Sequence, residues 1–131
     1  VFVHTGFVGN KQGDHPKMTY DTLRELTQDP LFTVGSHTIS HPDDMSQLDS
    51  FAQERELNES KRDLERELNL TVDFFAYPNG KNNEATQELA RAAGYKMAFS
   101  IDNGLAEESP NIMCISRYVH TRLEKALEDR E

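Results

Sequence analysis

The sequence LFTVGSHTISHP occupies residues 31–42 of this 131-residue chain. Its first five residues are rich in apolar and β-branched side chains, which predicts a buried strand over residues 31–35. Two histidines, His37 and His41, follow directly after that strand. Because ligands of α/β proteins collect in loops at the ends of strands, this stretch predicts both a sheet strand and a candidate site.

Strands and helices are expected to alternate along the rest of the chain. Apolar runs and alternations predict further strands at residues 1–8, 72–77, 96–101 and 113–119. Caps, apolar spacing and breakers predict helices at residues 19–30, 49–69, 83–94 and 121–129. This alternation is typical of parallel βα units, and it favours an α/β fold with an open sheet or part of a barrel.

The helix expected from Asp49 to Asn69 has the clearest pattern. Leu57, Leu64 and Leu68 recur at helical spacing and form a predicted buried stripe, while Arg55/Glu59 and Lys61/Glu65 are placed for ion pairs on the solvated face. The helix after Asn83 is expected to turn Ala85, Leu89, Ala92 and Ala93 inward and to end at Gly94. Thr19 and Thr121 are the expected caps of the first and last helices.

Composition excludes several classes of function. The 23 acidic and 14 basic residues give a net charge of -9 with no basic stripe, so the chain is not expected to bind nucleic acid. No apolar run approaches the roughly 20 residues of a membrane helix, so no membrane span is expected. The single cysteine, Cys114, excludes an internal disulfide and a cysteine-rich zinc module.

The chain opens in what resembles the middle of a strand. VFVHT at residues 1–5 alternates in polarity and has no initiating Met or signal-peptide core. We therefore expect residues 1–131 to be a single domain that is truncated at its N-terminus. A missing first strand would expose a sheet edge, and this predicts self-association of the chain.

His37 and His41 are four residues apart, a spacing at which two imidazoles can reach one metal ion. The same spacing also fits two histidines that only hydrogen-bond at a turn. A helical metalloprotease is excluded because position 38 is Thr where Glu would be the base. A serine hydrolase built from Ser36 and His37 is excluded because sequence neighbours point apart and no G-x-S-x-G motif occurs.

A second stretch, FAYPNGK at residues 75–81, ends the next predicted strand with a rigid turn. By itself it is also compatible with an ordinary turn and core aromatic side chains. Together, SHTISHP and FAYPNGK resemble the second and third motifs of the polysaccharide deacetylases, the NodB-homology domains. Further matches follow in order at ESK (residues 59–61), AGYK (93–96), NGL (103–105) and SRYV (116–119). The branch that deacetylates poly-N-acetylglucosamine is the most similar one.

The resemblance implies an incomplete, deformed (β/α) barrel and metal-dependent hydrolysis of N-acetyl groups on a β-linked N-acetylglucosamine polysaccharide. It implies that His37 and His41 bind a divalent metal, usually Zn²⁺. The Asn79 backbone N–H would face the oxyanion, and Tyr77 and Pro78 would form a wall of the sugar groove. A cell-envelope location is implied by the family alone.

The first motif of the family is an Asp-Asp pair on the first strand, which supplies the base and a third metal ligand, and no such strand with its aspartates occurs in this sequence. It is expected upstream of Val1, and this chain alone is expected to have little or no activity. Asp43-Asp44 is considered as a substitute, His120 as an alternative acid, and Arg117 either as a group that orients a carboxylate or as a surface ion pair. His4 and His15 have no evident partner.

Three alternatives remain open at this point. The chain could be a non-catalytic module that binds metal or carbohydrate, an amidase for a small cyclic amide, or an α/β domain with two structural histidines. A first motif such as Thr-Phe-Asp-Asp-Gly before Val1 would favour the enzyme over the binding module.

Overall fold

The computed structural model describes residues 1–12 and 15–130. Its centre is a four-stranded sheet in the order β1-β2-β3-β4, in which every neighbouring pair is parallel. The strands are β1 (Phe2–Val3), β2 (Gly35–Ser36), β3 (Phe74–Ala76) and β4 (Met97–Phe99), and the helices are α1 (Tyr20–Leu26), α2 (Ser50–Leu68), α3 (Glu84–Ala92) and α4 (Leu123–Glu128). The predicted α/β class with parallel βα units is confirmed.

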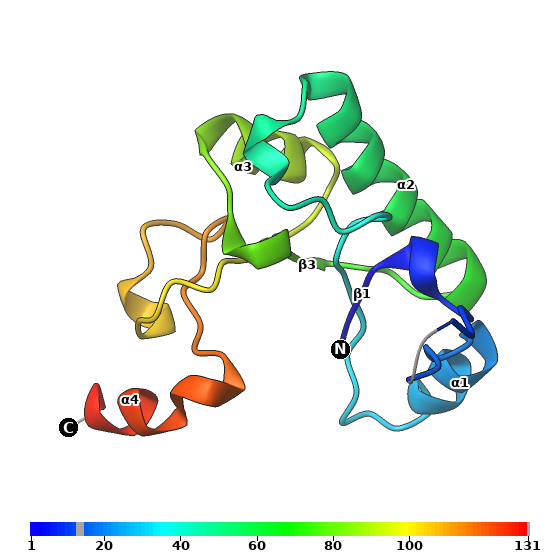
Figure 1. Ribbon diagram of the computed structural model, residues 1–131, viewed down its shortest axis with the longest axis horizontal. Helices are drawn as coiled ribbons and strands as arrows, with labels where there is room; N and C mark the ends of the chain where they lie inside the picture. Colours follow the sequence, from blue (N-terminus) through cyan, green and yellow to red (C-terminus); the bar gives the residue numbers. More distant parts are fainter. Residues whose placement is uncertain (13–14, 131) are drawn as a thin grey trace.

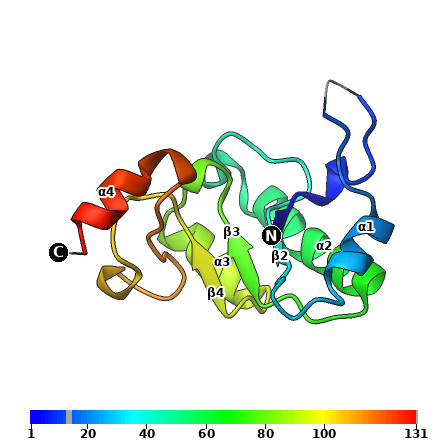
Figure 2. The same cartoon turned by 90° about the horizontal axis from the view of Figure 1, so that it is seen from below.

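The helices α2 and α3 pack on one side of this sheet, and α1 lies beside α2 (Figure 1). Figure 2 shows β3 and β4 in front of these helices, with α4 at the far end of the molecule from α1. The strand order matches the order along the chain, so α1, α2 and α3 each connect two neighbouring strands. Because the strands are parallel, the C-terminal ends of β1, β2 and β3 lie along the same side of the sheet. The two candidate motifs follow directly after β2 and β3 on that side.

The helix α2 follows its sequence closely. The Asp49 side chain accepts a hydrogen bond from the Ala52 N–H, and Asn69 ends the helix in the left-handed conformation. The buried face consists of Gln53, Leu57, Ser60, Leu64 and Leu68. The predicted leucine stripe is therefore confirmed, as are the Arg55–Glu59 (3.3 Å) and Lys61–Glu65 (2.9 Å) ion pairs.

The two faces of the sheet have different surroundings. Val3, Phe75 and Ala98 belong to the main core together with the α2 leucines. On the opposite face the half-buried rings of Phe2 and Phe99 have centroids 5.6 Å apart, and a Cβ at Gly35 would lie 2.6 Å from the Phe2 ring. Gly35 is therefore needed where this ring crosses the neighbouring strand.

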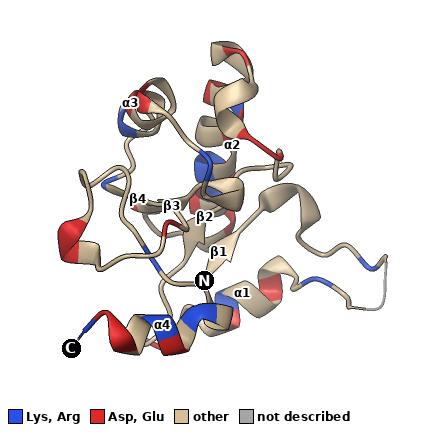
Figure 3. Ribbon diagram, turned by 60° about the vertical axis from the view of Figure 1, so that its left-hand side comes forward, with Lys and Arg blue, Asp and Glu red and all other residues tan. Residues whose placement is uncertain are grey.

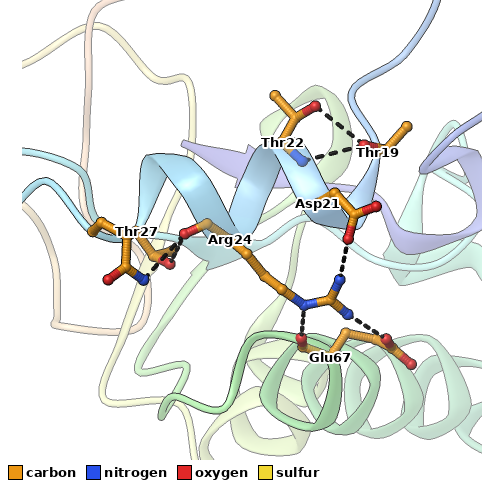
Figure 4. Close-up of polar contacts among 7 residues, drawn as sticks. Thr19, Asp21, Thr22, Arg24, Thr27 and Glu67 are labelled. Carbon is orange, nitrogen blue, oxygen red and sulfur yellow. Dashed lines mark hydrogen bonds and ion pairs between the residues drawn. The ribbon is translucent and has the colours of Figure 1, made fainter.

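Arg24 joins α1 to the end of α2 (Figure 4). Its guanidinium donates from Nε to the Glu67 carbonyl (2.8 Å), and it pairs with the carboxylates of Glu67 (3.0 Å) and Asp21 (2.6 Å). Thr19 caps α1 by accepting from the Thr22 N–H, as expected. The helix ends at Leu26, four residues before Pro30, because the N–H groups that follow Thr27 bond three residues back, Gln28 to the Glu25 carbonyl and Asp29 to the Leu26 carbonyl.

The strands are shorter than the sequence predicts, and the buried strand expected at residues 31–35 forms only at Gly35–Ser36, with Leu31 and Phe32 exposed. The expected strand at residues 1–8 stops at Val3, where Thr5 and Gly6 turn their N–H groups to the carbonyls of Thr38 and Ile39. The segment 113–119 is not a strand. It meets β4 only at the Phe99–Ile115 bridge, and then the Ser116 N–H bonds to the Ser109 side chain instead.

Two helical predictions are also corrected. The buried positions of α3 are Thr86 and Ala90, with Leu89 and Ala93 partly buried, while Ala85 and Ala92 are exposed. The Asn83 cap and the end at Gly94 are confirmed. Thr121 does not cap α4, because it lies inside a short 3-10 turn, His120–Arg122, that leads into the helix.

Charged side chains are confined to helices and loops. The four strands contain none of them, and Figure 3 shows red and blue segments on the helices and the loops around the sheet. Among the described residues, no helix has the length and apolar character needed to cross a membrane.

Candidate functional site

The loop that carries His37 and His41 begins directly at the end of β2. The register pairs Val3 with Ser36 and Ser36 with Phe75, so His4, His37 and Ala76 each come one residue after a paired position. The His37 N–H donates to the Val3 carbonyl (2.9 Å), which holds the start of this loop against β1. The sheet thus brings together three segments that are far apart in the sequence.

The imidazole rings of His37 and His41 lie edge to face, with centroids 4.8 Å apart and planes 76° apart. Two imidazoles bound to one tetrahedral metal ion, with metal–nitrogen distances of about 2.0–2.1 Å, have centroids about 5 Å apart. The His37 Nδ1 lies 2.6 Å from the Ala76 carbonyl oxygen. If Nδ1 carries the proton for this bond, Nε2 is left as the free ligand atom, which is the usual arrangement of a metal-binding histidine. The pair fits a metal ion.

The His37 ring is poised to be neutral. Its pKa is lowered to about 4, chiefly by burial and also by the neighbouring His41, His4 and Arg117, whereas the bond to the Ala76 carbonyl acts in the opposite direction. Since neutral imidazole is the form that binds metals, this environment favours binding over protonation at neutral pH.

His4 is a residue of this site that the sequence analysis missed. Its ring centroid lies 6.2 Å from that of His37 and 5.7 Å from that of His41, and its Nδ1 is buried without a hydrogen-bond partner among the described residues. In residues 1–12 and 15–130, no group of three or more His, Cys, Asp or Glu side chains is placed to hold a metal ion. His4 therefore borders the pair without completing a three-ligand set.

The FAYPNGK turn lies against the histidine loop. Asn79 is exposed with φ of 52°, and its side-chain Nδ2 donates to the Asp43 carbonyl oxygen (3.1 Å), just after the histidine loop. Together with the His37–Ala76 contact, this bond places both predicted motifs at one edge of the sheet.

Tyr77 and Pro78, the expected wall of the sugar groove, are not on the surface of the protein. Both side chains are fully buried, and the Tyr77 hydroxyl donates to the Met113 carbonyl (2.9 Å) while its ring packs on Phe75. Neither side chain has surface left to contact a sugar in this structure. Their contribution here is to hold the turn that presents Asn79.

The tyrosines should resist ionisation in the folded protein. Burial raises the pKa of Tyr77 and of Tyr95, the latter to about 12, and the bond to Asp129 raises that of Tyr118 to about 12. The unfolded chain releases these protons near pH 10, so the free energy of unfolding should fall as pH rises above 10. Absorbance at 295 nm should show little tyrosinate until unfolding begins. Native-state ionisation of these tyrosines with midpoints near pH 10 would contradict this.

The other candidate residues have different contacts. The Asp44 carboxylate caps a short 3-10 turn by accepting from the Ser46 N–H (2.9 Å), and in the described residues it forms no metal-binding group with His37 and His41. Arg117 donates to the Ser100 carbonyl (2.7 Å) and lies over the Phe2 ring, and no ion pair to it is found in the described part of the chain. His120 and His15 are exposed, and neither has a ring contact with His37 or His41.

Comparison with known proteins decides the family. The family model for polysaccharide deacetylases matches residues 1–98. The chain belongs to the polysaccharide deacetylase family. YxkH of Bacillus subtilis (strain 168), which carries the same family name, is 26% identical over 110 residues. The Streptococcus pyogenes deacetylase PplD, solved in complex with acetate, superposes over 95% of this chain with a TM-score of 0.80 and 26% identity. IcaB from Ammonifex degensii superposes over 99% of it with a TM-score of 0.80 and 23% identity.

These polysaccharide deacetylase relatives are longer than the chain. The matched part spans 39% of YxkH, 56% of PplD and 60% of IcaB. The solved structures have the parallel α/β fold of the family, and the arrangement described above is the corresponding part of its barrel.

Proposed function

We propose that this chain forms the histidine half of a metal-dependent N-deacetylase acting on a β-linked N-acetylglucosamine polysaccharide. The observation that carries the proposal is the adjacent pair of His37 and His41, whose rings lie edge to face 4.8 Å apart, with His37 Nδ1 held by the Ala76 carbonyl. The polymer is inferred from the likeness of the two motifs to the poly-N-acetylglucosamine branch. PplD binds acetate, the acid that hydrolysis of an N-acetyl group releases.

The residues of the chain would divide the work as follows. The two imidazoles would hold the divalent metal, Zn²⁺ by preference, and His37 would bind it through Nε2 because its Nδ1 lies against the Ala76 carbonyl. When bound, such an ion polarises a carbonyl and supplies hydroxide at neutral pH. The Asn79 backbone N–H would donate to the oxygen that becomes negative, and one donor of this kind is typically worth about 3 kcal/mol in the transition state.

Hydrolysis consumes one water and breaks the amide C–N bond, giving acetate and the free amine of glucosamine. It also needs a general base and a proton donor to the leaving amine. The first-strand aspartate pair that the resemblance gives as the source of the base does not occur in residues 1–131, so we expect the chain alone to bind metal without appreciable turnover.

Calorimetric titration of the chain with Zn²⁺ at neutral pH tests the pair. We expect one ion per chain, loss of binding in His37→Ala, and unchanged binding in His15→Ala, which removes an exposed histidine outside the pair. Wild-type chain that binds no Zn²⁺, or equal binding by His37→Ala, would refute the metal site.

The substrate class needs a separate assay with the complete product of the gene. Acetate release from a β-linked N-acetylglucosamine oligomer, stopped by a chelator and restored by Zn²⁺, is the expected result. Zn²⁺ binding without acetate release would favour the alternative of a non-catalytic module. Hydrolysis of a small cyclic amide in place of the oligomer would favour the amidase.

A further inference from the structure

The histidine loop has an unusual backbone. Thr38 has φ of 70° and His41 has φ of 54°, so two residues that are not glycine adopt the left-handed region within four positions. Such conformations persist only where surrounding contacts fix the chain. The contacts that fix this loop therefore decide where the two imidazoles lie.

One side of the loop is held by the segment after β1. Thr5 and Gly6 donate their N–H groups to the carbonyls of Thr38 (3.0 Å) and Ile39 (2.9 Å). Inside the loop, the buried Thr38 hydroxyl accepts from the His41 N–H (3.0 Å). These bonds use the carbonyl groups of the loop and leave the N–H groups of Ile39 and Ser40 to be satisfied from elsewhere.

A single carboxylate on α2 satisfies them. Glu56 Oε2 accepts from the N–H groups of Ile39 (2.7 Å) and Ser40 (3.0 Å), and its Oε1 accepts from the Ser40 hydroxyl (2.7 Å). Hydrogen bonds to an ionised acceptor are stronger than hydrogen bonds between two neutral groups. Both residues that Glu56 holds lie between the two histidines.

The helix that carries Glu56 is itself fixed to the start of the loop. One turn further along α2, the Ser60 hydroxyl lies 2.8 Å from that of Ser36, the last residue of β2, and both side chains are fully buried. The distance between Glu56 and the loop is therefore set by a rigid helix and a strand end, and not by the loop alone.

We propose that Glu56 is a positioning residue for the His37–His41 pair, which it sets at metal-binding separation by holding the backbone between them. This inference rests on the proposed function, because the pair is the site that it serves. Residues that support metal ligands typically change metal affinity 10- to 100-fold when they are replaced. Glu56→Gln keeps the length of the side chain but presents a neutral amide to the same donors, so it should weaken binding by about this factor.

A titration of the 131-residue chain with Co²⁺, monitored through the visible absorption bands of the ion, tests the proposal. The band positions report the geometry of the ligands and would not move if Glu56 served only the stability of α2. Glu56→Gln should bind Co²⁺ about 10- to 100-fold more weakly with shifted bands. Glu54→Gln is the matched control, since Glu54 lies on the exposed face of the same helix. This variant should leave the Co²⁺ affinity and the band positions unchanged.

A second variant keeps the test valid if Glu56→Gln fails to fold. Ser40→Ala removes only the hydroxyl bond to Glu56, and it should weaken Co²⁺ binding by a smaller factor, about 3-fold, with the fold retained. Wild-type affinity and unshifted bands in both variants would overturn the positioning role while leaving the metal site intact. Failure of the wild-type chain to bind Co²⁺ would overturn the metal site and this role together.

Discussion

Replacing Phe75 by alanine is expected to lower the free energy of unfolding by about 3–5 kcal/mol. Phe75 is fully buried at the centre of the sheet, and its ring centroid lies 5.1 Å from that of Tyr77 and 5.0 Å from that of Tyr95. The substitution removes the ring and leaves a cavity between helix and sheet. Because domains are stable by about 5–15 kcal/mol, this loss takes away a large part of the total.

Urea unfolding followed by circular dichroism measures the effect. Phe51→Ala is the matched control, since Phe51 lies in the first turn of α2 with 77% of its surface exposed, and it should change stability by less than about 0.5 kcal/mol. The pair compares the same change of side chain at a buried and an exposed position. A loss below about 1 kcal/mol for Phe75→Ala would show that the sheet is not packed as described.

Gly80→Ala is the second large effect, and it is expected to cost about 3 kcal/mol or more. Gly80 has φ of +69°, and an added Cβ would lie 2.5 Å from Ile101 Cγ1 and 2.6 Å from the Ile101 backbone nitrogen. The left-handed conformation costs about 1–2 kcal/mol for a residue with a Cβ. The clash with a backbone atom adds to this, because the neighbour cannot rotate away.

Gly9→Ala separates the two contributions. Gly9 has φ of +73°, but an added Cβ there would have no heavy atom within 4 Å, so only the conformational cost of about 1–2 kcal/mol is expected. Chemical denaturation of both variants gives the difference directly. An equal loss of unfolding free energy in Gly80→Ala and Gly9→Ala would mean that Ile101 does not contact the turn that presents Asn79.

The sequence by itself determined the features that arise from contacts within a few residues. The limits of α2, its buried leucines and its ion pairs follow from capping and from helical spacing. The caps Thr19 and Asn83 and the end at Gly94 are equally local. The two motifs also sufficed to indicate the family, because they preserve residue types at fixed spacing.

Patterns of apolar residues failed where the hydrogen bond of a side chain decides the structure. A strand continues only while a neighbouring strand pairs with its backbone, so the residues after Ile115 leave the sheet where the Ser116 N–H donates to the Ser109 hydroxyl. The buried face of α3 includes Thr86, whose hydroxyl bonds to Asn83 and so can be buried at little cost. A polar residue of this kind is invisible to a pattern of apolar spacing.

The candidate site divides in the same way. His37 and His41 can be found from their spacing and their place after a strand, since both lie in one short loop. His4 and Glu56 lie 33 and 19 residues from His37 in sequence, and only the parallel register of β1 and β2 and the packing of α2 bring them to it. Tertiary structure alone decides these neighbours, because hydrogen bonds between distant segments depend on how strands and helices pack and not on the residues next in the chain.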